Sequence, residues 1–341
     1  MRADLPSLTS LRAFAALGVF LFHLGAYGLP YNAHRAGYVG VAFFFVLSGF
    51  VLTWNVHGPV DLRRFWVRRV ARIYPAHIAI WLVILVLPVT TGVISLGQAL
   101  TNLTLVQAWI PSERFAYSMN GVTWSLACEV FFYLLFPLLV AVARRTRTRV
   151  LWAAAGTLFL VSGVVVVTIA QTMPGETWAA FAEVNPLVHL NEFVLGIVAA
   201  LSVRRGHRLP WQVVAATLLV CVGGAVLMHE KPALNVWATP VFVVLIVLVV
   251  QIELRRDFWL GHRWLVYAGT VSFAFYLVHQ RVIVWCDRAV GDGYLSAAIA
   301  LPVSAVLAVA LHHLIEKPAH RVIVRRWGAT KRTVASDPVN G

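Results

Sequence analysis

The stretch GYVGVAFFFVLSGFVLTWNV, residues 37–56, contains no charged side chain and decides the class of fold. A helix that crosses a bilayer needs about 20 consecutive, mostly apolar residues, and this stretch meets that requirement. Comparable stretches recur along most of the chain. We expect transmembrane segments near 8–29, 37–56, 73–91, 119–143, 150–171, 185–203, 211–228, 233–252, 265–286 and 295–315. The sequence therefore predicts an all-α polytopic membrane protein with about ten transmembrane helices.

The composition of the chain supports the same class. Hydrophobic residues make up 60% of the 341 positions and charged residues 12%, whereas soluble domains carry roughly 25% charged residues. A soluble protein of this size could not bury so much apolar side chain, so the lipid bilayer is a predicted partner. The formal net charge of +14 could indicate nucleic-acid binding. The basic residues, however, lie in short loops between apolar segments, and we expect no nucleic-acid partner.

The distribution of Lys and Arg predicts the orientation in the membrane. With the N-terminus in the cytoplasm, all but five of the 28 Lys and Arg residues fall on the cytoplasmic side, where such residues concentrate. The exceptions are Arg35, Arg114, Lys231, Arg281 and Arg288. An even number of spans then places the C-terminus in the cytoplasm as well. We expect a multi-pass protein with a membrane-embedded domain over 1–326 and a disordered tail over 327–341.

Ionisable side chains inside these spans are costly to bury and are therefore candidates for function. The first span contains Arg12 and His23. Their spacing places both on one face of a helix, about 16 Å apart along its axis. The structural alternative is an arginine that reaches the interface and a histidine bonded to a carbonyl group. Further ionisable residues within spans are Glu129, His189, Glu192 and His279.

The segment after the second span carries a dense group of arginines: Arg63, Arg64, Arg68, Arg69 and Arg72. At helical spacing the last three form one basic face. Cytoplasmic orientation explains part of this charge, but the density exceeds what orientation requires. Guanidinium groups bind phosphate through paired hydrogen bonds. We therefore predict a ligand that carries phosphate.

Other polar or small residues are assigned structural roles. Ser48 and Gly49 offer a small surface where the backbone of another helix can pack closely. We predict no metal centre and no disulfide from the three cysteines, because they lie in apolar stretches without metal-type spacing: Cys128, Cys221 and Cys286. A polar group at the end of the tenth span is expected to be solvated at the cytoplasmic rim: His312, His313 and Glu316.

These segments, in this order, resemble the membrane-bound acyltransferase family 3, whose members are mostly bacterial. The resemblance covers about 8–320. It is carried by six motifs: Arg12 to His23, FFVLSGF at 44–50, Arg69-x-x-Arg72-Ile-Tyr-Pro75, Trp124-Ser-Leu-x-x-Glu129, Ser272 to His279, and Ile315-Glu-Lys-Pro318. The resemblance implies an O-acyltransferase of the bacterial cytoplasmic membrane. It also implies acyl-CoA as a co-substrate, with no bound cofactor, and a hydroxyl-bearing acceptor.

The resemblance also implies roles for individual residues. His23 matches a catalytic histidine, Arg12 matches its functional partner, and Arg69 and Arg72 match a pair tied to activity. Val130 stands where many relatives have a second acidic residue, and Ala127 stands where serine is common. These departures put a mechanism with paired carboxylates in doubt, but not one that needs Glu129 alone.

We predict a mechanism on this basis. The donor phosphates bind Arg68, Arg69 and Arg72, and the pantetheine arm passes Arg12. His23 takes the proton from the acceptor hydroxyl as it attacks the thioester. Glu129 or His279 orients the imidazole or holds the acceptor, and Ser48 and Trp124 complete the predicted substrate site. Direct transfer and a His-linked acyl intermediate both remain open.

The first two spans look most like actinomycete members that acylate macrolides and similar antibiotics. Short outer loops at 30–36, 229–232 and 287–294 offer little surface for an extended glycan, so a macrolide-like acceptor is predicted. The alternatives are O-acetylation of a surface polysaccharide or lipid-linked sugar, a membrane transporter, and a non-catalytic scaffold. No inverted repeat with paired broken helices favours a transporter, and a scaffold leaves Arg12 and His23 unexplained.

Overall fold

The computed structural model describes residues 4–25, 35–87, 94–173, 175–227, 231–291 and 293–328, which contain helices and no strand. The predicted all-α class is therefore confirmed for this part of the chain. The α-helices are α1 (Pro6–Leu24), α2 (Gly40–Asn55), α3 (Leu62–Val86), α4 (Leu96–Leu103), α5 (Glu113–Ala116), α6 (Trp124–Arg145), α7 (Thr148–Thr172), α8 (Glu176–Val184), α9 (Pro186–Arg204), α10 (Trp211–Leu227), α11 (Lys231–Glu253), α12 (Arg263–Val290), α13 (Tyr294–Leu311) and α14 (Lys317–Trp327).

Seven helical segments within the described residues are long and apolar enough to cross a bilayer. They are Pro6–Leu24, Gly37–Asn55, Leu62–Val86, Gly121–Arg145, Thr148–Ile169, Ala180–Arg204 and Tyr294–Trp327. The predicted spans 211–228 and 233–252 contain shorter apolar helices, Trp211–Gly223 and Trp237–Glu253. The predicted span 265–286 falls on α12, where polar side chains such as His279 and Arg281 interrupt the apolar sequence. Ten crossings and cytoplasmic termini therefore remain predictions.

The arginine-rich segment differs from the expected loop. The whole of 62–86 is one helix, α3, so its arginines lie on a helix that continues into the span. Asp61 begins this helix early, because its side chain accepts a hydrogen bond from the Arg64 backbone N–H at 3.0 Å. Pro75 lies inside the helix and does not end it.

Some predictions fall on residues that the structure does not describe. These are 26–29, 88–91 and 228 at the ends of three predicted spans, 329–341 of the predicted tail, and parts of the predicted outer loops at 30–36, 229–232 and 287–294.

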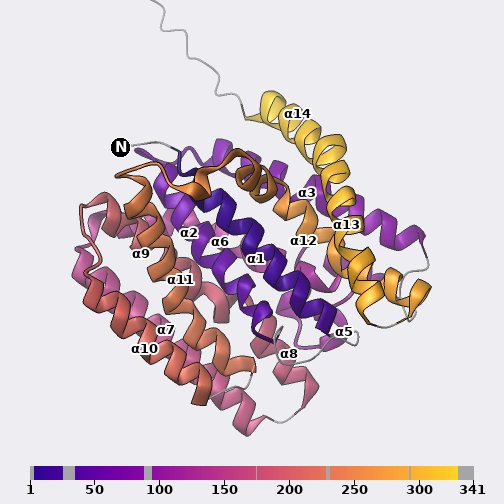
Figure 1. Ribbon diagram of the computed structural model, residues 1–341, viewed down its shortest axis with the longest axis horizontal. Coiled ribbons are helices and arrows are strands. Elements are labelled where there is room, and N and C mark those ends of the chain that lie inside the picture. The colour runs from indigo at the N-terminus through magenta and orange to yellow at the C-terminus, as the bar shows by residue number, and fades with distance from the viewer. Residues whose placement is uncertain are drawn as a thin grey trace, which may run out of the picture.

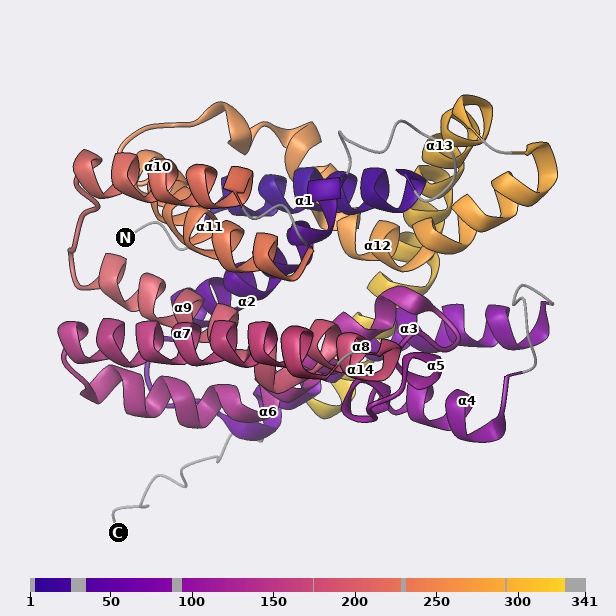
Figure 2. The same cartoon turned by 90° about the horizontal axis from the view of Figure 1, so that it is seen from below.

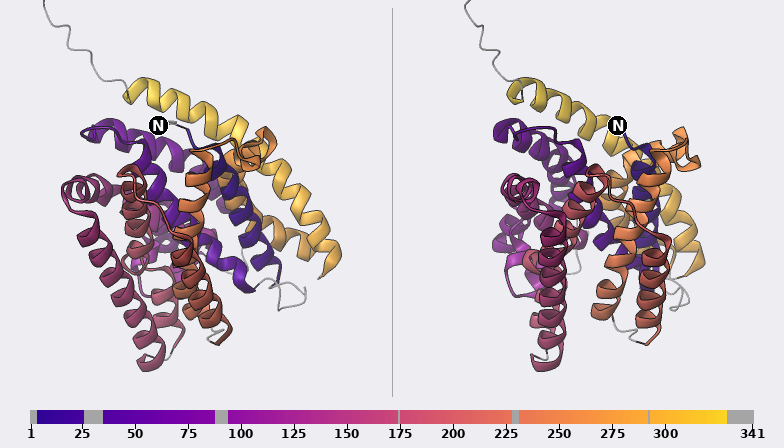
Figure 3. Two further views of the ribbon diagram at one scale, coloured as in Figure 1. Left: turned by 60° about the vertical axis from the view of Figure 1, so that its left-hand side comes forward. Right: turned by 90° about the vertical axis from the view of Figure 1, so that its left-hand side faces the viewer.

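The helices form one bundle with α1 and α2 near its centre (Figure 1). Figure 2 shows α10, α1 and α13 along one edge and α7, α6 and α3 along the other, with α2 and α9 between them. The most extensive packing joins α2 to α9, α1 to α12, and α12 to α13. The last helix, α14, lies across one end of the bundle (Figure 3) and packs against α3.

Glycine permits the closest of these crossings. A Cβ atom added to Gly49 of α2 would lie 2.1 Å from the carbonyl oxygen of Phe193, and one added to Gly196 of α9 would lie 2.0 Å from that of Val46. Gly269 brings α12 equally close to the backbone of α1. The packing role predicted for Gly49 is confirmed. These contacts hold α1, α2, α9 and α12 in a fixed arrangement around the candidate site.

Candidate active site

A cavity of about 530 Å³ brings together predicted site residues from four helices. Its wall contains Arg12 of α1, Ser48 of α2, Arg69 and Arg72 of α3, and Glu129 of α6. Apolar and aromatic side chains form most of the remaining wall: Phe44, Leu47, Val51, Leu52, Trp54, Tyr133 and Phe273. A cavity that combines apolar side chains with convergent polar groups is the usual form of a small-molecule site.

Two arginines of this wall have buried hydrogen-bond donors that no described residue accepts. These donors are the Nε atoms of Arg12 and Arg69. The Arg69 guanidinium lies over the rings of Phe65 and Tyr133, at 5.8 and 5.6 Å from their centroids. A buried donor without an acceptor costs about 1–3 kcal/mol, so such groups call for an explanation.

Glu129 is one of two acidic residues in the cavity wall, and the other is the exposed Asp4. Its carboxylate accepts a hydrogen bond from the Tyr133 hydroxyl at 3.1 Å, and no ion pair joins it to Arg12 within the described residues. Tyr133 was not predicted as a site residue. Its spacing from Glu129, four residues along a helix, is the signal that could have found it.

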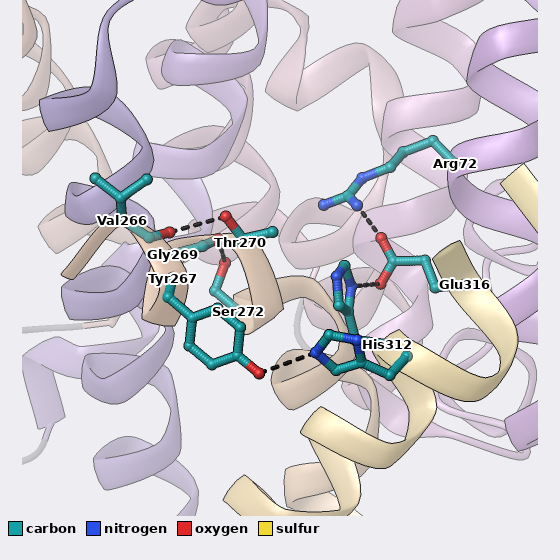
Figure 4. Close-up of polar contacts among 9 residues, drawn as sticks. Arg72, Val266, Tyr267, Gly269, Thr270, Ser272, His312 and Glu316 are labelled. Carbon is teal, nitrogen blue, oxygen red and sulfur yellow. Dashed lines mark hydrogen bonds and ion pairs between the residues drawn. The ribbon is translucent and has the colours of Figure 1, made fainter. Parts of the chain in front are cut away.

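Arg72 is held by residues from two other elements. Its guanidinium donates to Glu316 and lies 5.0 Å from the centroid of the Phe273 ring. His312 contributes a second hydrogen bond to Glu316, at 3.0 Å, and Figure 4 shows the three side chains together. The predicted solvated role of Glu316 and His312 is wrong: both are buried. Arg72 and His312 compensate the buried carboxylate, whereas His313 is exposed as expected.

A second cavity, of about 40 Å³, adjoins the first. The two share four wall residues: Arg12, Phe44, Glu129 and Phe273. Ser125 and Tyr276 line only the smaller cavity, and their hydroxyl oxygens lie 2.8 Å apart. The ring of Tyr276 is 5.6 Å from that of His279. The smaller cavity therefore leads from Arg12 towards the histidines of α1 and α12.

His23 and His279 form a pair beyond the smaller cavity. His23 Nδ1 lies 3.2 Å from His279 Nε2 and 2.9 Å from the carbonyl oxygen of Val19. His279 is fully buried, and its Nδ1 lies 2.7 Å from the carbonyl oxygen of Tyr276. A carbonyl oxygen only accepts, so both Nδ1 atoms carry protons. The one proton on His23 Nδ1 is then shared between the Val19 carbonyl oxygen and His279 Nε2, and the basic lone pair of His23 is on Nε2.

The structure places the remaining predicted residues elsewhere. Arg68 is exposed and does not line either cavity. Trp124 is also absent from both walls, and its ring packs 5.3 Å from that of His189. His189 is itself paired with Glu192 at 3.0 Å. Trp124 and His189 both pack against Phe45, whose side chain lies between them and the smaller cavity that it lines.

Comparison with known proteins identifies the family. The acyltransferase domain model of the acyltransferase 3 family matches residues 5–314. The chain is 36% identical to acyltransferase MdmB of Streptomyces mycarofaciens, over 98% of this chain and 95% of that protein. It is 26% identical to the putative peptidoglycan O-acetyltransferase YrhL of Bacillus subtilis, over 92% of this chain and 54% of that protein.

A shorter match, 33% identical, covers 40% of this chain and 24% of the O-acetyltransferase OatA of Staphylococcus aureus. No solved structure matches the chain. The matched region contains both histidines and every residue that lines the two cavities except Asp4. The chain therefore belongs to the acyltransferase 3 family and is a membrane enzyme that transfers acyl groups.

Proposed function

We propose that this enzyme transfers an acyl group from acyl-CoA to a hydroxyl of a macrolide-like natural product, in a bacterial cytoplasmic membrane that it crosses ten times. One observation supports the donor assignment. Arg12, Arg69 and Arg72 converge on one cavity, and Arg12 also lines the smaller cavity next to it, which leads towards His23. A long, thin donor with phosphates at one end and a thioester at the other fits that arrangement.

The donor binds along α1. Its phosphates bind Arg69 and Arg72 in the cavity wall, with the exposed Arg68 at the entrance. The pantetheine arm passes Arg12 towards the smaller cavity, which at about 40 Å³ must widen to admit it. Arg12 and His23 are about 16 Å apart along a helix axis, which is the scale of an extended pantetheine arm. The thioester then lies beside His23.

His23 acts as the general base. Its Nε2 takes the proton of the acceptor hydroxyl while the hydroxyl oxygen attacks the thioester carbonyl carbon. The C–S bond breaks, and the CoA thiolate leaves and receives that proton from His23. His279 holds the ring through the Nδ1–H bond at 3.2 Å, which strengthens when His23 is positively charged. Direct transfer needs no further co-reactant.

The acceptor is the finer part of this proposal. Similarity to MdmB extends over nearly the whole of both chains, and the opening two helices resemble antibiotic-tailoring members. An apolar acceptor could enter between helices from the bilayer. The second candidate is a cell-wall or surface glycan, because one relative is named a putative peptidoglycan O-acetyltransferase. This chain spans about half of that relative. The macrolide-like acceptor is preferred because the similarity to MdmB is higher and covers nearly all of both chains.

The test uses purified enzyme in lipid nanodiscs with labelled acetyl-CoA or propionyl-CoA and a panel of macrolides. The wild-type enzyme should add one acyl group to a macrolide and release CoA, both measured by mass spectrometry. His23→Ala should lose about 10²–10⁴-fold in rate, and His262→Ala, at an exposed position before α12, is the matched control.

Retention of most activity by His23→Ala would exclude His23 as the base. Gene deletion tests the acceptor: loss of acyl groups from a surface glycan, with unchanged secreted metabolites, would favour the second candidate.

A further inference from the structure

A π-helical turn joins α13 to α14 and points one carboxylate inwards. The turn is His312–Glu316. It precedes Pro318, which has no N–H to donate to the carbonyl group four residues earlier, so a regular α-helical bond is missing there. Such turns within helices are frequent at functional sites. Glu316 is 2% exposed, while its neighbour Leu314 is 74% exposed.

Both oxygens of this buried carboxylate are engaged. Oε1 accepts from Arg72 of α3, and Oε2 accepts from His312 Nδ1–H at 3.0 Å. Figure 4 shows His312, Glu316 and Arg72 in this order, from the turn towards α3. A carboxylate with two donors has a fixed orientation, and it fixes the orientation of the guanidinium that it binds. Removing one partner of such a buried charge pair leaves the other charge without compensation, which is strongly destabilising.

Glu316 and its partner Arg72 differ in their position relative to the large cavity. Arg72 lines the large cavity, whereas Glu316 does not. The carboxylate therefore binds Arg72 from outside the cavity, and Phe273 supports the guanidinium 5.0 Å from its ring centroid. Arg69 has aromatic neighbours but no carboxylate partner among the described residues. Of the three arginines in the wall of the large cavity, Arg72 is the one with an ion pair among the described residues.

We propose that Glu316, oriented by His312, is a positioning residue that fixes the Arg72 guanidinium in the cavity wall for binding the phosphates of the donor. This inference rests on the proposed function, since it assumes that Arg72 binds the donor. Glu316 touches neither donor nor acceptor. Its effect therefore passes entirely through Arg72, and removing it should weaken donor binding more than turnover at saturating donor.

The test measures CoA affinity of the full-length enzyme in nanodiscs by calorimetry, together with KM and kcat for acetyl-CoA. Glu316→Gln should weaken CoA binding about tenfold, the loss expected for a hydrogen bond between charged groups. The Arg72→Ala, Glu316→Gln double variant should bind CoA no more weakly than Arg72→Ala alone. The kcat of Glu316→Gln, measured at saturating donor, should stay close to that of the wild-type enzyme.

His312 provides a second, milder perturbation. His312→Leu removes the donor to Glu316 and should weaken CoA binding several-fold, whereas His312→Asn retains an N–H in a similar place and should bind CoA nearly as wild type. His313→Asn is the matched control, because His313 is exposed and contacts Tyr267 rather than Glu316. The His312 and His313 variants therefore test the positioning role even if Glu316→Gln fails to fold.

Three outcomes would overturn the inference. Tighter CoA binding by Glu316→Gln would mean that the carboxylate competes with the donor. Additive losses in the double variant would mean that Glu316 acts independently of Arg72. If Arg72→Ala binds CoA more weakly but Glu316→Gln or His312→Leu binds CoA as tightly as wild type, the positioning role is refuted while the donor role of Arg72 stands. An unchanged CoA affinity in Arg72→Ala would instead refute the donor role of Arg72 in the proposed function.

Discussion

His279→Phe would remove one hydrogen-bond acceptor from the histidine pair and leave most of the packing in place. Phenylalanine can keep the stacked contact with Phe275, whose ring is 6.0 Å from that of His279 at 9°. It cannot accept the His23 Nδ1–H bond of 3.2 Å. His279→Gln is the matched control, since its side-chain oxygen can accept that bond without providing an imidazole.

The expected loss follows from how this bond changes during the reaction. A hydrogen bond between neutral groups contributes about 1 kcal/mol, and one to a charged group about 1.5–3 kcal/mol. His23 is neutral before proton transfer and positive after it, so the bond strengthens by roughly 0.5–2 kcal/mol. Only that difference lowers the barrier. At 1.36 kcal/mol for each factor of ten, His279→Phe should lose at most about 30-fold in kcat, because the Val19 carbonyl oxygen at 2.9 Å still accepts from His23 Nδ1–H.

The assay is acyl transfer at saturating acetyl-CoA, with CoA release followed by a thiol reagent and melting temperatures measured in the same detergent. His279→Gln should stay within roughly twofold of wild type. Wild-type kcat in His279→Phe would show that the bond does not support catalysis. A loss as large as that of His23→Ala, in a variant with normal melting, would show that His279 takes part in proton transfer itself.

Three further predictions address the cavity and the packing around it. Glu129→Gln should lower activity at least tenfold with little change in melting temperature, because glutamine still accepts from the Tyr133 hydroxyl; wild-type activity would make the charge dispensable. Arg69→Ala should raise KM for acetyl-CoA more than for the acceptor, and less so for a donor without the 3′-phosphate; an equal effect on both donors would argue for a folding role. Gly196→Ala should prevent normal folding, since its Cβ would lie 2.0 Å from the Val46 carbonyl oxygen, 1.4 Å short of the 3.4 Å at which ordinary contact begins. Gly156→Ala in α7, with nothing within 4 Å, is its control and should melt no lower than wild type.

Residues with a strong local signal could be predicted from the sequence. Arg12 and Glu129 are charges within apolar stretches, and such groups converge in the interior because lipid excludes them. Both line the large cavity. The membrane class followed for the same reason, from long apolar stretches. The start of α3 was missed because the charge-rich segment 62–72 resembles a loop, although Asp61 is a good helix cap.

Glu316 shows why other site residues could not be predicted. Its partner Arg72 lies 244 residues earlier in the chain, and no periodicity within one helix predicts which distant charge will approach it. Lys and His beside it favour a solvated rim in the sequence, but the packing of α14 and the π-helical turn on α3 buries it. Tyr276 was passed over for a similar reason. Its hydroxyl forms a hydrogen bond with Ser125 of another helix, α6, which no pattern within α12 predicts.

The packing of α1 beside α12 determines how far along α1 the donor and the acceptor must reach. Both helices run in the same direction: Gly269 meets Thr9 near their starts, Phe275 lies 5.5 Å from Phe20 further along, and His279 meets His23. The large cavity reaches the beginning of α1, and the histidine pair lies near its end. In the proposed reaction, therefore, the phosphates bind the arginines of α3, and the pantetheine arm extends along α1 so that its thioester end reaches His23. The acceptor hydroxyl needs to reach only the far end of that path.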